Sequence, residues 1–217
     1  MASRFEVPSH ANQAFVQAAV EWLHEPTTTM QQALDFYESM YGTPGCDDWT
    51  IAQMGRHDRF FLGVHLVGRK DLVHPWLYAR FREVEAAPDG RLDLWFREGY
   101  KSTVITFLGS IQELLRDPEL TIGIFSHTKA IAKKFLFQIK QELEKNELLK
   151  ALYPEILWAD PARDAPKWTD DAITVKRLLN PKENSIEASG LVDGMPTGAH
   201  YGLRIYDDVV VPASVNT

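Results

Sequence analysis

The chain has 217 residues, of which 45% are hydrophobic and 24% charged, and its formal net charge is −7 at pH 7. That length suits one large domain, or a domain with an appendage, and the acidic balance argues against a protein that wraps nucleic acid with its whole surface. A single cysteine, Cys46, excludes an intramolecular disulfide framework and is typical of a reducing cytoplasm. The sequence contains neither an apolar run of membrane-spanning length nor a recognisable signal segment.

Residues 1–73 are predicted to form a mainly helical N-terminal segment. Apolar residues recur at helical spacing over 12–23 and again over 29–40. The segment carries no recognisable chemistry, and a lid over a ligand is the one role that we suggest for it. Two histidines of the segment and the first residue after it are candidate metal ligands, but their spacing matches no standard zinc pattern and favours core or surface positions. These histidines are His57, His65 and His74.

Residues 74–217 alternate between helix and strand patterns. The run over 120–125 is continuously apolar, which is typical of a strand in a parallel sheet with both faces covered. Strand–helix–strand–helix order implies parallel βαβ units and therefore an α/β fold. In chain order we predict a helix over 75–85, a strand over 93–96, a helix over 101–116, a strand over 120–125, a helix from 129, short strands over 173–176 and 185–188, and a strand over 202–206.

The junction after the predicted strand over 93–96 has the layout of a phosphate-binding loop (Walker A). In such loops backbone N–H groups at a helix start face the phosphates, a lysine reaches the β and γ oxygens, and a hydroxyl holds Mg²⁺. The match to G-x-x-x-x-G-K-[ST] is imperfect, because Trp95 and Tyr100 stand at the glycine positions and Gly99 lies one residue early. A plain strand-to-helix connection with an exposed lysine is the alternative. The candidate nucleotide-binding residues are Arg97, Glu98, Gly99, Tyr100, Lys101, Ser102 and Thr103.

Two adjacent acids, Asp207 and Asp208, follow the predicted strand over 202–206. A P-loop ATPase needs one carboxylate at a strand end to support Mg²⁺ and a second one to orient or deprotonate the attacking water (Walker B). Adjacent acids at a strand end fit both roles, and their separation from Lys101 is normal for such enzymes. A solvated Asp-Asp turn is the alternative, because aspartate is common in turns.

The order of these segments resembles the ATPase domain of large terminase subunits, the DNA-packaging motors of tailed bacteriophages. The resemblance covers residues 74–211 and is carried by four segments in order, namely 96–103, 122–128 with the helix after it, 168–175 with 184–190, and 200–208. It implies a P-loop NTPase fold of the ASCE type, with a mainly parallel central sheet flanked by helices and a helical N-terminal segment.

The resemblance also implies an activity, which is ATP hydrolysis with ATP and Mg²⁺ as cofactors. By position, Lys101 would contact the β and γ phosphates, while Ser102 and Asp207 would hold Mg²⁺. Asp208 stands where the family usually has a glutamate that activates water, and its shorter side chain departs from that pattern. Arg97 matches an arginine of the loop that could stabilise charge on the γ-phosphate, with a structural ion pair as an equal alternative.

Hydrolysis in that family moves double-stranded DNA into a procapsid. The implied partners are double-stranded DNA gripped through its backbone, a portal protein, a small terminase subunit and further copies in a ring. The implied location is the host cytoplasm, transiently at the procapsid portal, with no membrane. Lys133, Lys134 and Lys140 share one predicted helix and face either DNA or solvent. Because the sequence ends at Thr217, we expect a fragment without the nuclease domain, with weak ATPase activity and a monomeric state as alternatives to the assembled motor.

Two other classes remain open from the sequence. One is a helicase-type P-loop NTPase that acts on nucleic acid. The other is a non-catalytic assembly module with a degenerate nucleotide fold, which the bulky residues Trp95 and Tyr100 favour. A small-molecule kinase is a remote further alternative.

Overall fold

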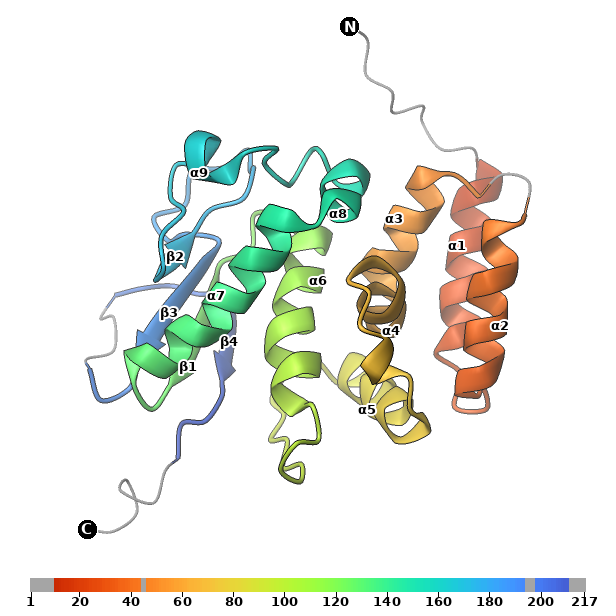
Figure 1. The fold of residues 1–217 in the computed structure, drawn as a ribbon, viewed down its shortest axis with the longest axis horizontal. Coiled ribbons are helices and arrows are strands. Elements are labelled where there is room, and N and C mark those ends of the chain that lie inside the picture. Colours follow the sequence, from red (N-terminus) through yellow and green to blue (C-terminus); the bar gives the residue numbers. More distant parts are fainter. Residues whose placement is uncertain (1–9, 44–45, 194–197, 211–217) are drawn as a thin grey trace, which may run out of the picture. The chain divides into compact units, whose positions relative to one another are not determined.

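The computed structural model describes residues 10–43, 46–193 and 198–210, so residues 211–217 of the predicted core lie outside the described part. The chain divides into two compact units, Met1–Gly99 and Tyr100–Thr217 (Figure 1). The helix over 75–85, which the sequence groups with the core, belongs to the first unit. Helices together with a four-stranded sheet confirm the α/β class. Within the described ranges, no helix has the length and apolar character needed to cross a bilayer.

The described part of residues 1–73 is mainly helical, as predicted, and the first unit also contains α5 (Pro75–Ala86). Its second helix begins with a capping box. The side chain of Thr29 accepts from the backbone N–H of Gln32, and the side chain of Gln32 accepts from the backbone N–H of Thr29. Such reciprocal bonds satisfy backbone donors that a helix start leaves without partners. The elements are α1 (His10–Leu23), α2 (Met30–Tyr41), α3 (Asp48–His57), α4 (Arg59–Phe61), the π-helical turn η1 (Leu62–Leu66), the 3₁₀ turn η2 (Lys70–Leu72) and α5 (Pro75–Ala86).

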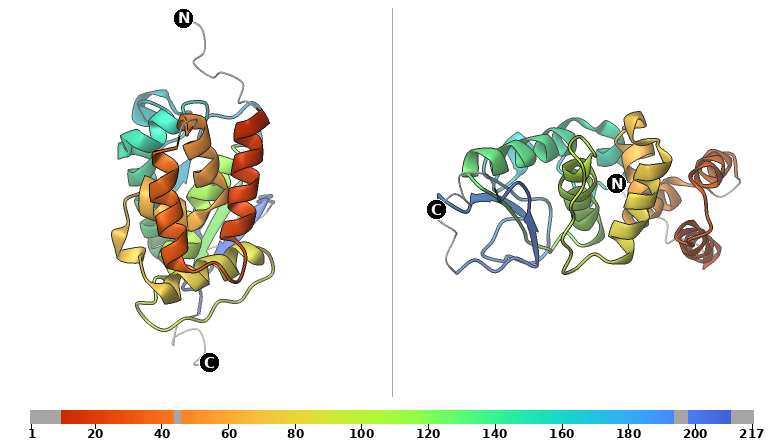
Figure 2. Two further views of the ribbon diagram at one scale, coloured as in Figure 1. Left: turned by 90° about the vertical axis from the view of Figure 1, so that its right-hand side faces the viewer. Right: turned by 90° about the horizontal axis from the view of Figure 1, so that it is seen from below.

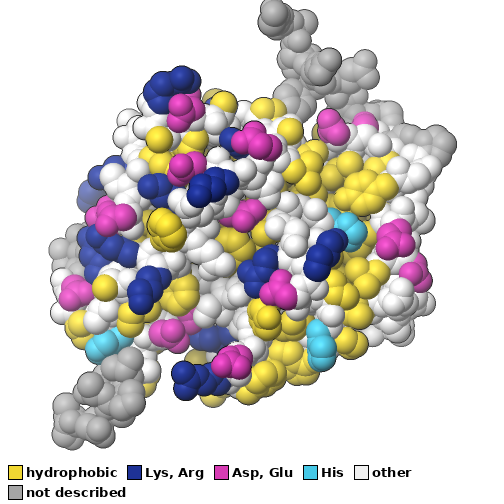
Figure 3. Space-filling model, viewed as in Figure 1, with side chains coloured by type: hydrophobic (Ala, Val, Ile, Leu, Met, Phe, Trp, Pro, Cys, Tyr) yellow, Lys and Arg dark blue, Asp and Glu magenta, His cyan; other side chains and the backbone are white. Residues whose placement is uncertain are grey.

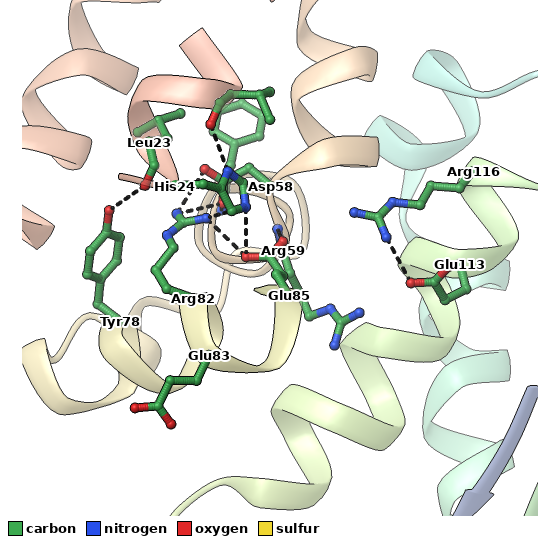
Figure 4. A network of polar contacts seen from close by, with 12 residues as sticks. Leu23, His24, Asp58, Arg59, Tyr78, Arg82, Glu83, Glu85, Glu113 and Arg116 are labelled. Atoms are coloured by element: carbon green, nitrogen blue, oxygen red, sulfur yellow. Dashed lines mark hydrogen bonds and ion pairs between the residues drawn. The ribbon is translucent and has the colours of Figure 1, made fainter. Parts of the chain in front are cut away.

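A buried network of charges joins the helices of this unit (Figure 4). Asp58 is fully buried, and its carboxylate accepts hydrogen bonds from Arg82 at 2.9 and 3.0 Å and from the Tyr37 hydroxyl at 2.6 Å. Arg82 also donates to Glu85 at 3.0 Å, and Glu85 lies 3.4 Å from the His24 ring. Each buried charge therefore has an opposite charge beside it, which offsets the large cost of removing it from water.

Glu85 and His24 pair with each other, and their pKa values shift in opposite directions. Burial alone would raise the pKa of Glu85, but the hydrogen bond from His24 and the charge of Arg82 outweigh it and lower that pKa to about 2. Burial alone would lower the pKa of His24, but the hydrogen bond and charge of Glu85 outweigh it and raise that pKa. Glu85 therefore adds stability above its unfolded pKa, and this is lost as pH falls toward 2. His24 adds stability below its unfolded pKa, and this is lost as pH rises through its raised value.

We predict that Arg82→Met lowers the free energy of unfolding by about 3–5 kcal/mol, because it removes the guanidinium that the buried carboxylates of Asp58 and Glu85 share. The matched control is Arg80→Met on the same helix, whose partly exposed ion pair with Glu83 should contribute about 1 kcal/mol or less. Urea denaturation followed by circular dichroism measures both changes. Equal losses in the two variants would contradict the importance of the buried network.

The predicted strand over 93–96 is wrong. In the described part of the chain, residues 91–96 form neither helix nor strand, and the side chains of Leu92 and Leu94 are each 84% exposed. The two aromatic side chains of the segment pack on Trp76 of α5. The ring centroid of Trp95 lies 5.4 Å from that of Trp76, and the ring centroid of Phe96 lies 4.8 Å from it. Alternation of apolar and polar residues is compatible with any extended segment. Here the segment packs through its aromatic side chains and does not pair with another strand.

The second unit contains the sheet and the helices that pack on it. Its strands lie in the order β2-β3-β1-β4 (Figure 1). The β1–β3 and β1–β4 pairs are parallel and the β2–β3 pair is antiparallel, so the sheet is mixed. The elements are the π-helical turn η3 (Thr103–Phe107), α6 (Leu108–Arg116), β1 (Ile122–Ser126), α7 (Lys129–Lys145), α8 (Glu147–Leu152), α9 (Pro161–Asp164), β2 (Ala172–Ile173), β3 (Ile186–Gly190) and β4 (Leu203–Tyr206).

Helix α7 lies along one face of this sheet (Figure 2). Its buried face consists of apolar residues at helical spacing, as the sequence predicts: Ala132, Leu136, Ile139 and Leu143. Every residue of β1 is buried, in agreement with its continuous apolar sequence. Because β1, β3 and β4 run parallel, their carboxyl ends meet at one edge of the sheet. In open α/β sheets ligands bind outside this edge.

Candidate functional site

The helical segment that carries Lys101 starts with a π-helical turn. Lys101 and Ser102 are already helical, η3 follows directly, and α6 continues it to Arg116, so the predicted helix over 101–116 is confirmed. At the end of η3 the N–H of Leu108 donates to the carbonyl of Thr103, five residues earlier, whereas an α-helical N–H donates to the carbonyl four residues earlier. π-helical turns of this kind occur frequently at functional sites.

Asp207 directly follows β4 and is held by the end of its neighbour β1. Its N–H donates to the carbonyl of Phe125 at 2.9 Å, and the hydroxyl of Ser126 donates to its carbonyl. The Asp207 side chain is only 3% exposed. The last backbone bonds of a parallel pair of strands thus place a nearly buried carboxylate at the carboxyl edge of the sheet.

Two side chains of the helical segment bind this carboxylate. The ammonium of Lys101 donates to Asp207 Oδ1 at 2.6 Å, although the two residues are 106 positions apart in sequence. The hydroxyl of Thr106 donates to Asp207 Oδ2 at 2.7 Å, and Thr106 is 1% exposed. Both carboxylate oxygens therefore have a donor. The Lys101 side chain keeps 30% of its surface exposed, so solvent reaches the ammonium side of the cluster.

The second acid, Asp208, faces a different environment from Asp207. Its side chain is exposed, and its φ of 51° lies in the left-handed region, which aspartate tolerates better than most residues. Its carbonyl accepts from the N–H of His127 at 3.1 Å. The turn therefore directs one carboxylate of the pair inward and leaves the other in solvent.

Tyr100, which stands where the phosphate-loop pattern has its second glycine, adopts the conformation that glycine favours. Its φ is 61°, and Glu98 two residues earlier has a φ of 66°. Positive φ is uncommon for residues other than glycine, and such strain collects at functional sites. The backbone at this position therefore has the shape of a glycine turn despite its bulky side chain.

The other predicted loop residues are distributed between the two units. Arg97, Glu98 and Gly99 end the first unit, where the N–H of Gly99 donates to the carbonyl of Phe96 at 3.0 Å. Ser102 and Thr103 follow Lys101 and are half-buried. The structure thus brings together Lys101 and Asp207 of the predicted site, and it adds Thr106, which the sequence analysis missed. No signal in the sequence indicates Thr106, since residues five apart lie on different faces of a regular α-helix.

The lysines of α7 are partly engaged with acids. Lys133 pairs with Asp170 at 2.8 Å, and Lys129 pairs with Asp171 at 3.1 Å. Figure 3 shows Lys and Arg side chains interspersed with Asp and Glu side chains on the face it views. Contact of Lys133, Lys134 and Lys140 with DNA stays a prediction.

A cavity of about 350 Å³ lies elsewhere in the second unit, against the start of α7. Lys129, Asp171, Glu187 and Asp193 line it, so charges of both signs face the same space. The carboxylate of Asp193 already accepts a hydrogen bond from the backbone N–H of Lys129. The amide at this helix start is therefore occupied by a group of the chain itself, unlike an open anion site.

The donor groups around Asp207 fit a metal that is bound together with a nucleotide. Among the residues described, no group of three or more His, Cys, Asp or Glu side chains could hold a metal ion. Mg²⁺ at nucleotide sites needs only one or two carboxylates, because phosphates and waters complete its shell. One carboxylate with the hydroxyl of Thr106 and the ammonium of Lys101 beside it matches that requirement and does not match a protein-only metal cage.

Comparison of the chain with protein-family models, with curated proteins and with solved structures gave no match.

We predict that Tyr100→Gly is more stable than Tyr100→Ala by about 1 kcal/mol, because alanine is strained at positive φ and glycine is not. Both variants remove the same ring, so its contacts cancel in the comparison. The free energy of unfolding in urea measures the difference. At a position with ordinary negative φ the order would be reversed, and that order here would contradict the strained turn.

Proposed function

We propose that the second unit binds ATP with Mg²⁺ and hydrolyses it, as a P-loop NTPase of the ASCE type. The observation that supports this most strongly is the contact of Lys101 at a helix start with Asp207 at a strand end. A nucleoside triphosphate requires an ammonium for its β and γ oxygens and a carboxylate that supports its metal ion. The two groups lie next to each other at the sheet edge where ligands bind in open α/β folds.

In this proposal each residue of the cluster has a separate role. Lys101 leaves Asp207 and donates to phosphate oxygens, for which its partly exposed side chain is suited. Asp207 and the hydroxyl of Ser102 would then hold the metal, which neutralises charge on the phosphates. The exposed Asp208 would accept a proton from the attacking water. Arg97 lies in the first unit, and its role as an arginine finger stays a prediction.

The finer proposal is that hydrolysis moves double-stranded DNA, as in the large terminase subunits that the sequence resembles. Its partners would be DNA backbone, a portal protein, a small terminase subunit and further copies in a ring, in the host cytoplasm and at the procapsid portal. A helicase-type NTPase would use the same nucleotide site with single-stranded nucleic acid. A non-catalytic assembly module would lack nucleotide turnover.

We predict that the chain binds ATP with Mg²⁺ and that Lys101→Ala weakens binding at least about tenfold. A hydrogen bond to a charged group contributes about 1.5–3 kcal/mol, and this variant removes such bonds to the phosphates. Isothermal titration calorimetry measures both affinities, and Lys134→Ala, an exposed lysine of α7, is the control that should bind like the wild type. Equal affinity of the wild type and Lys101→Ala would contradict the site, and absence of binding by the wild type would contradict the function.

We also predict that double-stranded DNA stimulates ATP hydrolysis without regard to its sequence, because a motor that tracks any sequence relies on phosphate contacts. The stimulation should fall steeply as salt rises, since counterions compete for those contacts. A phosphate-release assay with duplexes of different sequence and with single strands at matched length measures it. Stimulation by single strands alone would instead support the helicase-type alternative.

A further inference from the structure

We propose that Thr106 is a positioning residue that assigns separate roles to the two oxygens of Asp207. This inference rests on the proposed function and adds to it a residue that the phosphate-loop pattern does not contain. The Thr106 hydroxyl holds Oδ2 at 2.7 Å, so Oδ1 alone faces Lys101. Thr106 is 1% and Asp207 2% exposed, so water does not compete freely for this bond.

The π-helical turn explains why Lys101 and Thr106 reach the same carboxylate. In a regular α-helix, residues five apart point in directions that differ by roughly 140°. The π-helical turn η3 accommodates one additional residue, so that residues five apart are related as residues four apart normally are, roughly 40° from each other. The unusual helical turn therefore places an ammonium and a hydroxyl on one face, opposite the end of β4.

The main chain of Asp207 is held as firmly as its side chain. Ser126, which is fully buried, donates its hydroxyl to the carbonyl of Asp207, and the N–H of Asp207 donates to Phe125. With the backbone fixed by β1, the carboxylate can still turn about the bonds of its own side chain. The bond from Thr106 opposes that rotation.

This arrangement gives Oδ1 a single exchangeable partner. That partner is Lys101. If Lys101 turned to a phosphate, Oδ1 would become available to a metal ion, while Oδ2 would stay on Thr106. Loss of the Thr106 hydroxyl would let the carboxylate rotate, and outer-shell partners that orient a metal ligand typically contribute 10–100-fold to metal affinity or activity.

The test compares Thr106→Val, which keeps the shape and removes the hydroxyl, with Thr106→Ser, which keeps the hydroxyl. Ser110→Ala is the matched control, because Ser110 is a fully buried hydroxyl on the same helical segment with no hydrogen-bond partner in the described part of the chain. The first readout is the Tm without nucleotide. The second is binding of a fluorescent ATP analogue at increasing Mg²⁺, which does not require turnover.

We expect Thr106→Val to lower the Tm by roughly 3–8 °C, as loss of a bond to a charged group should in a chain of this size. It should raise the Mg²⁺ concentration for half-maximal analogue binding at least about tenfold. Thr106→Ser should restore both values toward the wild type, and Ser110→Ala should change neither appreciably.

Several results would overturn the inference. A Tm change in Thr106→Val no larger than in Ser110→Ala would show that the hydroxyl does not hold Asp207. A lowered Tm with unchanged Mg²⁺ dependence would make Thr106 structural only. If the wild type itself does not bind the analogue with Mg²⁺, the proposed function fails and the positioning role fails with it. Wild-type binding with an unaffected Thr106→Val variant rejects the positioning role alone.

Discussion

The ammonium of Lys101 and the carboxylate of Asp207 are 2.6 Å apart, and this pair connects the start of a helix with the end of a strand. A carboxylate with 3% of its side chain exposed is costly to keep charged unless a cation or hydrogen-bond donors accompany it. The second unit meets that requirement with Lys101 and with Thr106, both on the segment that begins the unit. The parallel pairing of β1 and β4 positions the other member of the pair, because it places Asp207 at the carboxyl edge of the sheet.

The two units use buried charge in different ways. In the first unit, Asp58 and Glu85 are bound to Arg82, whose side chain is only 13% exposed, and the network is closed by tyrosine and histidine side chains. Two buried carboxylates thus share the Arg82 guanidinium, which is poorly placed to bind a ligand. In the second unit, the cation that pairs with Asp207 is 30% exposed on a flexible side chain. The nucleotide site proposed above would need a partner that can leave, and a partly exposed lysine meets that need.

Much of the architecture could be predicted from the sequence, because apolar periodicity reports directly on burial. The amphipathic pattern of α7 and the continuous apolar run of β1 identify their positions in the core. The strand over 93–96 could not be rejected from its pattern, since an extended segment alternates whether or not another strand pairs with it. Motif order assigned Lys101 and Asp207 to one site, but it did not predict the ion pair between them. Thr106 was not predicted, because regular helical spacing turns it away from Lys101. Only the additional residue in η3 brings the two together.

Covalent labelling with an acyl-phosphate derivative of ATP tests whether Lys101 binds the phosphates, since such a probe acylates a lysine that lies beside the bound phosphates. Mass spectrometry of the whole chain then identifies the acylated lysine. We predict labelling at Lys101 that free ATP with Mg²⁺ suppresses. Labelling at other lysines only, or labelling of Lys101 that excess ATP leaves unchanged, would contradict it.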